Sequence, residues 1–552
     1  MYQLVQYLYY AVQLCCRPSS TPGVVEGRGM ESFDYVIVGA GSAGCVLANR
    51  LTASGEVTVL LLEAGGPDNA PAMQIPAAVH SMLGTAHDWA YKSLPQEFNA
   101  SRLRVPRGKT LGGSSSLNAM IYSRGNRADY DRWRDQCGAR GWGFDEVLRY
   151  FVRSEANARL SGSLHGTEGP LRVEDPLWTH ELCPTWIESA VSAGIPANDD
   201  FSGPSQSGAG IYQLTQRDGR RWSVADAYLH PIMDRPNLTV RTRSAVSKIL
   251  LDNQVASGVL YHAGNCEHLA YAEREVLLCA GAIASPQLLM ISGIGPAQQL
   301  RAAGVSVALD SPNVGVGLRD HPATALVWTT KDTTDFWDVV AAEDAAARWT
   351  RERRGPLTSV VCEAGMFFST SGPDELPNIQ VLAGATSYWD DGTGYTDVPC
   401  TTAVVALVDP TSHGSVRLRN ADPTAHPLID PRFYTERRDL DAMLAAIDMV
   451  VDVAHQAPLA RLISGPLLPA TEPLSRRGHL SHVRMCTQTM YRPTGTCAMG
   501  DSPKAVVDSE LRVRGIENLR VIDASVMPET VRGDNNAPVV MIAEKAADLI
   551  GT

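Results

Sequence analysis

The most specific chemical feature of this sequence is a glycine pattern that directly follows a short apolar run. Gly39, Gly41 and Gly44 are spaced as Gly-x-Gly-x-x-Gly, with Ser42 and Ala43 between the last two glycines. This spacing permits a tight turn, close approach of a phosphate to the backbone and close packing of a following helix. Free N–H groups at the start of that helix would bind an anion. The pattern predicts a pyrophosphate-binding turn.

An acidic residue follows at the distance that a dinucleotide site requires. Glu63 lies nineteen positions after Gly44, at the end of a second apolar run, and Ala64 comes next. A carboxylate at this place suits the ribose hydroxyls of an adenosine. Two strands, a glycine turn and an acid in register therefore favour a dinucleotide cofactor over a glycine-rich turn without a ligand.

A second stretch, 106–125, is rich in small residues. Such a segment forms no core element alone, but it can pack along a large flat ligand. This favours a flavin over a nicotinamide, and a flexible surface loop is the alternative. The candidate cofactor-binding residues here are Arg107, Gly108, Thr110, Gly112, Gly113, Ser114, Asn118, Ala119, Met120 and Ile121.

Apolar periodicity and turn residues predict the elements that position these groups. We expect strands over 33–38, 57–62, 169–173, 238–242, 245–251, 255–262, 275–281, 404–408, 414–418 and 519–523. We expect helices over 45–51, 129–137, 145–158, 220–229, 284–295, 440–455 and 537–549. The strands 404–408 and 414–418 suggest an antiparallel sheet.

Length and composition limit the class of protein. The chain has 552 residues, 44% of them hydrophobic and 20% charged, so two or three globular domains are expected. A net charge of −12 argues against nucleic acid as a partner. No apolar stretch is long enough to span a membrane, and no metal site is indicated. The 11 scattered cysteines favour reduced thiols and a cytoplasmic location. The oligomeric state stays open.

On these residues the chain resembles the glucose–methanol–choline (GMC) family of FAD oxidoreductases over 31–551, and within it bacterial alcohol and choline dehydrogenases. The motifs that carry the resemblance are 106–124, 281–295, 495–497 and 523–525. The resemblance implies an α/β plus α+β protein, with a Rossmann-like FAD-binding domain and a substrate domain built on an antiparallel sheet. It implies FAD segments at 30–160, 226–320 and 495–552, substrate segments at 161–225 and 321–494, and a tail at 1–29.

The resemblance also assigns cofactor contacts outside the two glycine-rich stretches. Val246 would touch adenine, Asp523 and Ala524 the ribityl chain and pyrophosphate, and Asn536 and Pro538 the pyrimidine edge of the flavin. Ala280 and Gly281 belong to the same set. A helix that begins near Pro538 would aim its positive end at the flavin carbonyl where negative charge collects on reduction. Leu117 occupies the loop in which some relatives carry a flavin-tethering histidine, so FAD is expected to bind non-covalently.

One position departs from the family pattern. The usual frame is Tyr-His-Pro-x-Gly-Thr-Cys, and here Arg492 follows Tyr491 in place of the histidine. A guanidinium has no acceptor lone pair, so Arg492 cannot be the base that takes the alcohol proton. The second polar residue of the family site is kept as Asn536. We expect Arg492 to provide a fixed positive charge near the flavin.

Three functions remain open. The first is alcohol oxidation with another base, for which Glu363 is the candidate because it aligns with a carboxylate in choline-oxidising relatives. The second is a changed chemistry in which Arg492 binds a carboxylate, as in fatty acid photodecarboxylases. Cys362 aligns with a cysteine of their site, but their carboxylate-binding arginine falls at Leu382. The third is an FAD-binding module with little catalysis.

For the first function we expect an apolar or aromatic alcohol, since no aromatic cage for choline surrounds Glu363. The expected pocket residues are Cys362, Met366, Leu382 and Tyr491. Oxygen and a quinone both remain possible electron acceptors. Among the other histidines, the sequence predicts a structural role for His321, a hairpin turn for His413 and a solvated helix for His479 and His482.

Overall fold

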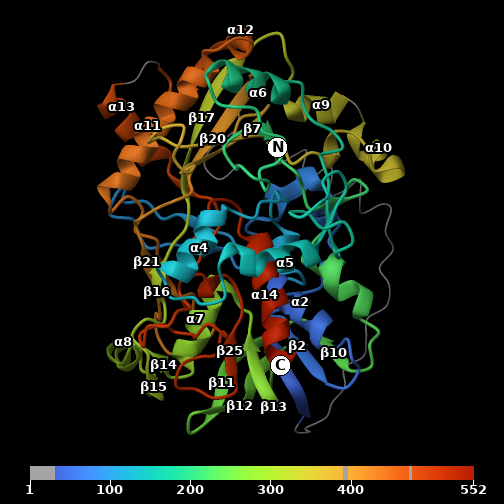
Figure 1. Ribbon diagram of the computed structural model, residues 1–552, viewed down its shortest axis with the longest axis vertical. Coiled ribbons are helices and arrows are strands. Elements are labelled where there is room, and N and C mark those ends of the chain that lie inside the picture. The colour runs from blue at the N-terminus through green and yellow to red at the C-terminus, as the bar shows by residue number, and fades with distance from the viewer. Residues whose placement is uncertain (1–30, 343, 389–395, 472–474, 552) are drawn as a thin grey trace.

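The computed structural model describes residues 31–342, 344–388, 396–471 and 475–551, so the expected tail at 1–29 lies outside the described residues. Two sheets occupy opposite ends of the molecule (Figure 1). The sheet drawn at the bottom contains the first strand, and the C-terminal helix packs on it. The sheet drawn at the top is formed by the middle of the chain. Helices around 127–154 lie between them.

The first sheet has the strand order β10-β2-β1-β13-β12-β11, with β25 also paired to β13. Its strands are β1 (Glu31–Val38), β2 (Val59–Leu62), β10 (Leu238–Arg241), β11 (Ser244–Asp252), β12 (Val255–Ala263), β13 (Cys266–Leu278) and β25 (Leu519–Val521). Neighbours from β10 to β13, and β25, run parallel, whereas β11, β12 and β13 pair antiparallel. All four residues of β2 are buried, as expected for a parallel strand covered on both faces.

Helices cover this sheet, and three of them begin at the edge formed by the carboxyl ends of β1 and β2. They are α2 (Ser42–Leu51), α7 (Gly281–Ile291) and α14 (Asn536–Gly551), with α4 (Arg127–Asp135) and α5 (Phe144–Ser154) above them. Helix α14 packs against both α2 and α5. Eleven residues of α14 are buried, including Glu544, whose carboxylate is paired with Arg50 of α2 at 2.7 Å. The last helix is therefore an internal part of the molecule.

The second sheet is antiparallel throughout, with the order β23-β17-β20-β19-β18-β7, and β24 also pairs with β17. Its strands are β7 (Gly208–Ile211), β17 (Pro322–Thr330), β18 (Ala364–Phe368), β19 (Ile379–Gly384), β20 (Cys400–Leu407), β23 (Ile463–Leu468) and β24 (Gln488–Thr489). The helices α6 (Leu182–Ser192), α11 (Arg437–Ala454) and α13 (Arg476–Cys486) pack on the outer side of this sheet. One face is thus covered, and the other face is turned toward the first sheet.

Smaller elements complete the chain. The short strands are β3 (Tyr91–Lys92), β4 (Arg104–Val105), β5 (Glu155–Asn157), β6 (Leu171–Val173), β8 (Gln216–Arg217), β9 (Arg220–Arg221), β14 (Ile294–Gly295), β15 (Leu309–Asp310), β16 (Val316–Leu318), β21 (Gly414–Arg417) and β22 (Leu428–Asp430). The remaining helices are α3 (Pro71–Gln74), α8 (Ala297–Ala302), α9 (Phe336–Ala342), α10 (Ala345–Glu352) and α12 (Leu459–Leu462). Short 3₁₀ segments are η1 (Pro76–Met82), η2 (Gly113–Ser116), η4 (His230–Ile232), η5 (Pro356–Thr358) and η6 (Ala524–Val526), and η3 (Ala225–Leu229) is a π-helical turn.

Two secondary-structure expectations were wrong. The segment 220–229 is not one helix, because Arg220 and Arg221 form β9 and the helical turn starts only at Ala225. The strands expected at 404–408 and 414–418 do not share a sheet: β20 lies in the second sheet, and β21 pairs with β16 and β22 in a separate three-stranded sheet. Local periodicity specifies a strand but not its partner.

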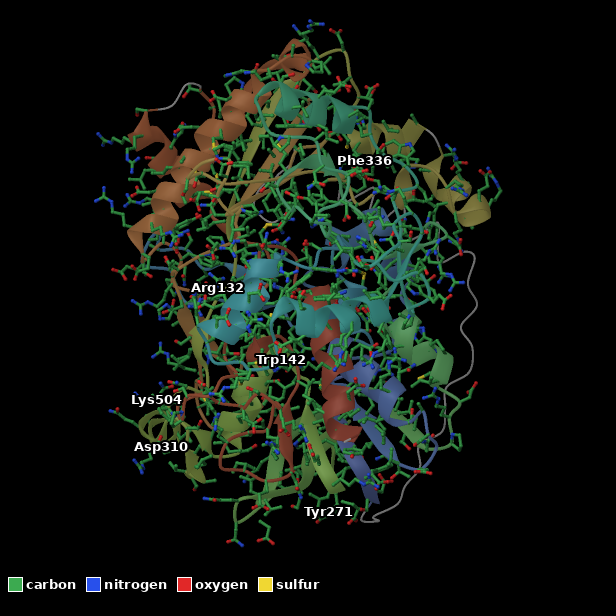
Figure 2. All side chains as sticks on the ribbon, in the orientation of Figure 1. Arg132, Trp142, Tyr271, Asp310, Phe336 and Lys504 are labelled. Carbon is green, nitrogen blue, oxygen red and sulfur yellow. The ribbon has the colours of Figure 1, made fainter. Side chains whose placement is uncertain are left out.

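Ion pairs join the two halves at the level of α4. Arg132, labelled in Figure 2, donates to Asp409 at 3.0 Å, just after β20. Asp409 also accepts from Arg532 at 2.7 Å, and Arg532 pairs with the buried carboxylate of Asp129. This cluster links α4, the end of β20 and the segment that leads into α14. It fixes the second sheet over the cofactor edge of the first.

Candidate active site

A cavity of about 340 Å³ lies between the two sheets. Its floor is formed by the carboxyl ends of β1 and β2, at Val38 and Leu62, and by the starts of α2, α7 and α14. Its roof is the inner face of the second sheet, at Leu382 and Val404. A ligand crevice beyond the carboxyl ends of parallel strands is the expected position for a dinucleotide.

The three glycines of the turn have different surroundings. Gly39 has a φ of +100°, which L side chains rarely adopt. A Cβ on Gly44 would meet the carbonyl oxygen of Gly39 at 2.0 Å, so Gly44 provides close packing of the helix on the turn. A Cβ on Gly41 would meet no protein atom within 4 Å. Gly41 therefore faces open space in the cavity, where a phosphate group fits.

Glu63 lies at the end of β2 with its carboxylate held by the backbone. Oε2 accepts the N–H of Ala40 at 2.9 Å and Oε1 accepts the N–H of Gly65 at 2.8 Å. Burial raises the pKa of this carboxyl to about 7, against the opposing effect of those two hydrogen bonds. The carboxylate is oriented at the cavity edge, ready to accept hydrogen bonds from vicinal hydroxyl groups.

The small-residue stretch packs directly on the glycine turn. A Cβ on Gly113 would come within 2.8 Å of the Cα of Gly41, and a Cβ on Gly108 would meet Gly113 at 2.2 Å. Asn118 is fixed by the buried guanidinium of Arg221, which donates to its Oδ1 at 2.8 Å. The glycines are thus required for packing of one backbone against another, and the segment is not a loose surface loop.

Asp523 organises the opposite wall. Its Oδ2 accepts from the N–H of Gly281 at 2.8 Å and from Ser285, and its Oδ1 accepts from the N–H and hydroxyl of Ser525. Burial raises its pKa. A Cβ on Gly281 would meet nothing within 4 Å, so the start of α7 is also open to a ligand. Asp523 joins α7 to the segment after β25.

Arg492 is 4% exposed in the cavity wall, and both of its terminal nitrogens have partners, whereas its Nε has none. One terminal nitrogen donates to Gln380 at 2.6 Å and contacts His321 Nδ1 at 3.2 Å. The other donates to Asp534 Oδ1 at 2.7 Å. The backbone N–H of Arg492 donates to the buried Asp320 at 2.8 Å. The guanidinium is therefore fixed and its charge is balanced by a neighbouring carboxylate.

Glu363 does not lie beside Arg492, contrary to expectation. It is fully buried, and its carboxylate accepts from Ser359 and from the thiol of Cys183 on α6 at 3.4 Å. Cys362 lines the cavity, whereas Glu363 points toward α6, where its carboxylate meets Cys183. Met366 also lies on the α6 side and packs in the core beneath α6 and α11.

Most of the other expected residues line the cavity. These are Gly39, Gly41, Ser42, Ala43, Glu63, Ala64, Arg107, Gly108, Gly113, Ser114, Asn118, Ala119, Ile121, Val246, Ala280, Gly281, Cys362, Leu382, Tyr491, Arg492, Asp523, Ala524 and Asn536. Those outside the lining are Gly44, Thr110, Gly112, Met120, Glu363, Met366 and Pro538. Leu117 also lines the cavity.

Several lining residues had no sequence prediction. They include His80 on η1, Tyr388, Val404, Met490 and Asp534. Asp534 stands two positions before Asn536, and this proximity to a predicted site residue was the one sequence signal that could have identified it. His80 lies in a stretch without a motif, and its imidazole packs on Tyr388 with ring centroids 5.1 Å apart. Burial lowers the pKa of His80 to about 4.

The histidines singled out from the sequence are structural or exposed, whereas His426, which had no sequence prediction, lines the cavity. His321 is completely buried between Arg492 and Thr530, and burial together with the Arg492 charge holds its pKa well below the usual range. His479 and His482 are 7% and 2% exposed, so α13 does not expose them to solvent as expected. His413 is exposed, but it precedes β21 and is not in a hairpin between paired strands.

Comparison with known proteins gives the family. The family models described as GMC oxidoreductase match residues 33–323 and 410–543. The chain belongs to the GMC oxidoreductase family. It is an FAD-dependent oxidoreductase. The open faces of Gly41 and Gly281, the held carboxylate of Glu63 and the helix N-termini at the cavity fit this cofactor.

Similar proteins cover almost the whole chain. An alcohol dehydrogenase (acceptor) of Pseudomonas putida is 38% identical, over 94% of this chain and 95% of its own. An oxygen-dependent choline dehydrogenase of Paraburkholderia phymatum is 40% identical, over 94% and 92%. Among solved structures, a pyridoxine 4-oxidase has a TM-score of 0.86 and 32% identity over 93% and 98%, and a formate oxidase has 0.89 and 28% over 95% and 99%.

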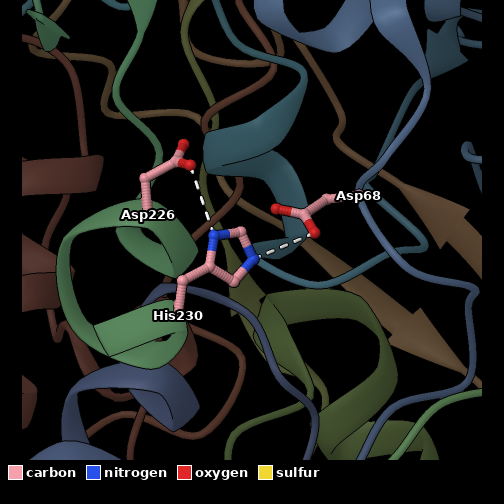
Figure 3. A group of neighbouring side chains, drawn as sticks. All are labelled: Asp68, Asp226 and His230. Atoms are coloured by element: carbon pink, nitrogen blue, oxygen red, sulfur yellow. Dashed lines mark hydrogen bonds and ion pairs between the residues drawn. The ribbon is translucent and has the colours of Figure 1, made fainter. Parts of the chain in front are cut away.

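Two further features concern partners. No helix within the described ranges is both long and apolar enough to cross a membrane. Asp68, Asp226 and His230 form a cluster of metal-ligand type (Figure 3). However, both ring nitrogens of His230 face a carboxylate oxygen, at 3.1 Å for Asp68 and 3.4 Å for Asp226. Hydrogen bonds to these two aspartates raise the pKa of His230 to about 10, which makes the cluster an ion pair.

Proposed function

We propose that this flavoenzyme oxidises the CH–OH group of an apolar or aromatic alcohol. The observation that carries the proposal is the lining of the cavity roof, which consists of Val360, Leu382, Val404 and Met490 with the ring of Tyr388. An apolar substrate buries its surface against such side chains at a gain of about 25 cal/mol per Å². The first relative named above is an alcohol dehydrogenase, which supports the same reaction type.

The charge pattern supports an alcohol over choline. A trimethylammonium group favours aromatic faces and a carboxylate nearby. Glu363 was the candidate carboxylate, and it is turned out of the cavity toward Cys183. The carboxylate that does line the cavity here, Asp534, is paired with Arg492, so it attracts a trimethylammonium group less than an unpaired carboxylate would.

The contacts of Arg492 also weigh against the carboxylate-binding alternative. Both terminal nitrogens already donate to protein groups, Gln380 and Asp534. A bidentate contact of a substrate carboxylate with these two terminal nitrogens would compete with Gln380 and Asp534. The third alternative, an FAD-binding module with little catalysis, has no observation in its favour.

We propose that FAD is bound non-covalently. Leu117 lines the cavity at the position where a tethering histidine would lie, and a leucine side chain forms no bond to a flavin. Precipitation of the yellow protein with acid should release all of the flavin into the supernatant. Flavin that stays with the pellet would contradict the proposal.

The substrate proposal is tested by anaerobic mixing of the oxidised enzyme with single alcohols. Benzyl alcohol and 1-octanol should bleach the flavin absorption band faster than choline or glucose at equal concentration. Octanoic acid in the dark serves as the carboxylate control and should leave the band unchanged. Faster bleaching by choline would overturn the proposal. Reoxidation of the reduced enzyme by oxygen or by a quinone then identifies the electron acceptor.

A further inference from the structure

Asp534 has an unusual position in the active site. It lines the cavity just before α14, and its side chain is 21% exposed. Its Oδ1 accepts the hydrogen bond of Arg492, whereas its Oδ2 has no hydrogen-bond partner. A buried carboxylate oxygen is rarely left without a partner. The site therefore holds an ionisable group with unused capacity beside the position where the family frame places a histidine.

The other acids that line the cavity are already committed. Both oxygens of Glu63 accept backbone N–H groups, and this carboxyl lies at the adenosine end of the cavity. Both oxygens of Asp523 accept hydrogen bonds at the start of α7 and from Ser525. Two histidines also line the cavity. His80 has no partner at Nδ1 and its ring packs on Tyr388, and the ring of His426 packs on Tyr91.

We propose that Asp534 accepts the hydroxyl proton of the alcohol and so performs the task that Arg492 cannot. This rests on the proposed function. In the step, the O–H bond breaks and its proton moves to the Asp534 carboxylate, while the carbinol C–H bond breaks and a C=O bond forms. The hydrogen leaves with its electron pair and is taken up by oxidised FAD, which supplies the hydride acceptor when bound. Asp534 later returns its proton to solvent.

The surroundings of Asp534 set its strength as a base. Arg492 is in contact with it, while Gln380 and Tyr212 lie on the strands behind, and the Tyr212 hydroxyl donates to the Val381 carbonyl. His321, which touches Arg492, is neutral. Burial raises the pKa of Asp534, and the charge of Arg492 with the hydrogen bonds of Gln380 and Arg492 opposes that rise without cancelling it. A carboxyl with a raised pKa is a stronger base than an ordinary one.

Arg492 then has a different role from that of a base. Its guanidinium donates to Asp534 through one terminal nitrogen and to Gln380 through the other, so it positions the carboxylate. It stays positively charged when the alcohol loses its proton. A fixed cation beside the reacting oxygen stabilises the developing negative charge. Asp534 would thus accept the proton and Arg492 would stabilise the negative charge, two tasks that the family motif assigns to one histidine.

The test is Asp534→Asn in the FAD-loaded enzyme, with benzyl alcohol as the probe under anaerobic conditions. Loss of general-base assistance should slow flavin reduction by about 10²–10⁴-fold. In the unsubstituted enzyme the rate should rise with pH as the carboxyl ionises, and this rise should be absent in the variant. Asp534→Glu, which keeps an ionisable group, should recover part of the rate and restore a rise with pH.

Gln380→Leu is the matched control, because it removes the other acceptor of Arg492 without removing an ionisable group. If Asp534 served only to anchor Arg492, both variants would lose a similar factor and both would keep the rise with pH. That result would overturn the proposal. A loss of the rise in His80→Ala instead would assign the base to His80. If no alcohol reduces the unsubstituted enzyme, the proposed function fails, and this assignment fails with it.

Discussion

The hydroxyl of Ser42 donates a 2.7 Å hydrogen bond to the amide oxygen of Asn536. The two residues are 494 positions apart and begin the helices α2 and α14. The bond holds two positive helix ends side by side at one wall of the cavity. Pyrophosphate binding and stabilisation of the reduced flavin would therefore depend on a single shared contact.

Ser42→Ala removes this contact and leaves the amide oxygen of Asn536 without its donor. A hydrogen bond of this kind is worth about 0.5–1.5 kcal/mol, so the affinity for FAD should fall about 2- to 13-fold. Titration of the apoprotein with FAD, followed by quenching of flavin fluorescence, measures the change. Ser192→Ala is a control outside the cavity lining, on α6, where the hydroxyl donates to the carbonyl of Glu188 at 2.9 Å. An unchanged affinity in Ser42→Ala would show that the helices are held without this bond.

Gly41→Ala and Gly44→Ala should fail in different ways. The Cβ at Gly41 meets no protein atom, so the variant should fold with unchanged stability but lose most of its affinity for FAD. The Cβ at Gly44 meets a carbonyl oxygen at 2.0 Å, so that variant should be destabilised even without cofactor. Thermal unfolding of both apoproteins, with FAD titration, separates the two effects. Normal FAD binding by Gly41→Ala would exclude phosphate contact at this turn.

The affinity for FAD should depend on pH through Glu63. Its pKa is raised to about 7 in the unliganded protein, and hydroxyl groups of the ribose donate to the ionised form. Binding therefore favours loss of the proton, and the affinity should rise with pH up to about 7 and level off above it. Below that value it should fall by up to about tenfold per pH unit. Glu63→Gln should bind more weakly above neutral pH and show no such rise.

Substitution of Arg492 should lower the free energy of unfolding, because it leaves a carboxylate without its ion-pair partner. Arg492→Met leaves Asp534 and Gln380 without their donor in a mostly buried site. Asp534 is partly exposed, so we expect a loss of about 2–3 kcal/mol, below the full value for a completely buried pair. Arg437→Met is the control, since the pair Arg437–Asp441 is exposed and should contribute less than about 1 kcal/mol. Urea unfolding of both apoproteins measures the difference.

The His230 cluster should stabilise the fold in a pH-dependent way. The pKa of His230 is raised from 6.5 to about 10, so its contribution is full below pH 6.5 and is lost as the pH rises to about 10. The difference in Tm between the protein and His230→Gln should accordingly shrink over that range. His413→Gln, at an exposed histidine, should shift Tm little at any pH. A constant difference for His230→Gln would rule out the charged imidazole.

The floor of the cavity could be predicted from the sequence, and its roof could not. Gly39, Gly41 and Glu63 follow short-range rules, because a phosphate turn needs particular residues at particular spacings, and Gly281 came from the family resemblance. The roof depends on which face of each strand meets the cavity. Local sequence does not specify that face, which is why Met366 and Glu363 were misplaced while Leu382 and Cys362 were not.

The ion-pair partners could not be predicted from the sequence either. Arg492 was singled out by a departure from a motif, but its partner Asp534 lies 42 positions away in another segment. The burial of His479 and His482 depends on packing of α13 against the second sheet, which the periodicity of that helix alone did not reveal. The domain boundaries stay a prediction.

The order of the segments along the chain has a consequence for how the enzyme matures. The cavity walls draw on residues from Val38 to Val539, and the sheet beneath them closes only when β25 pairs with β13. During translation, the glycine turn leaves the ribosome long before the helix that Ser42 must meet. The nascent chain consequently presents half a binding site to the cell's FAD. The complete cofactor site is therefore formed only after α14 has been synthesised.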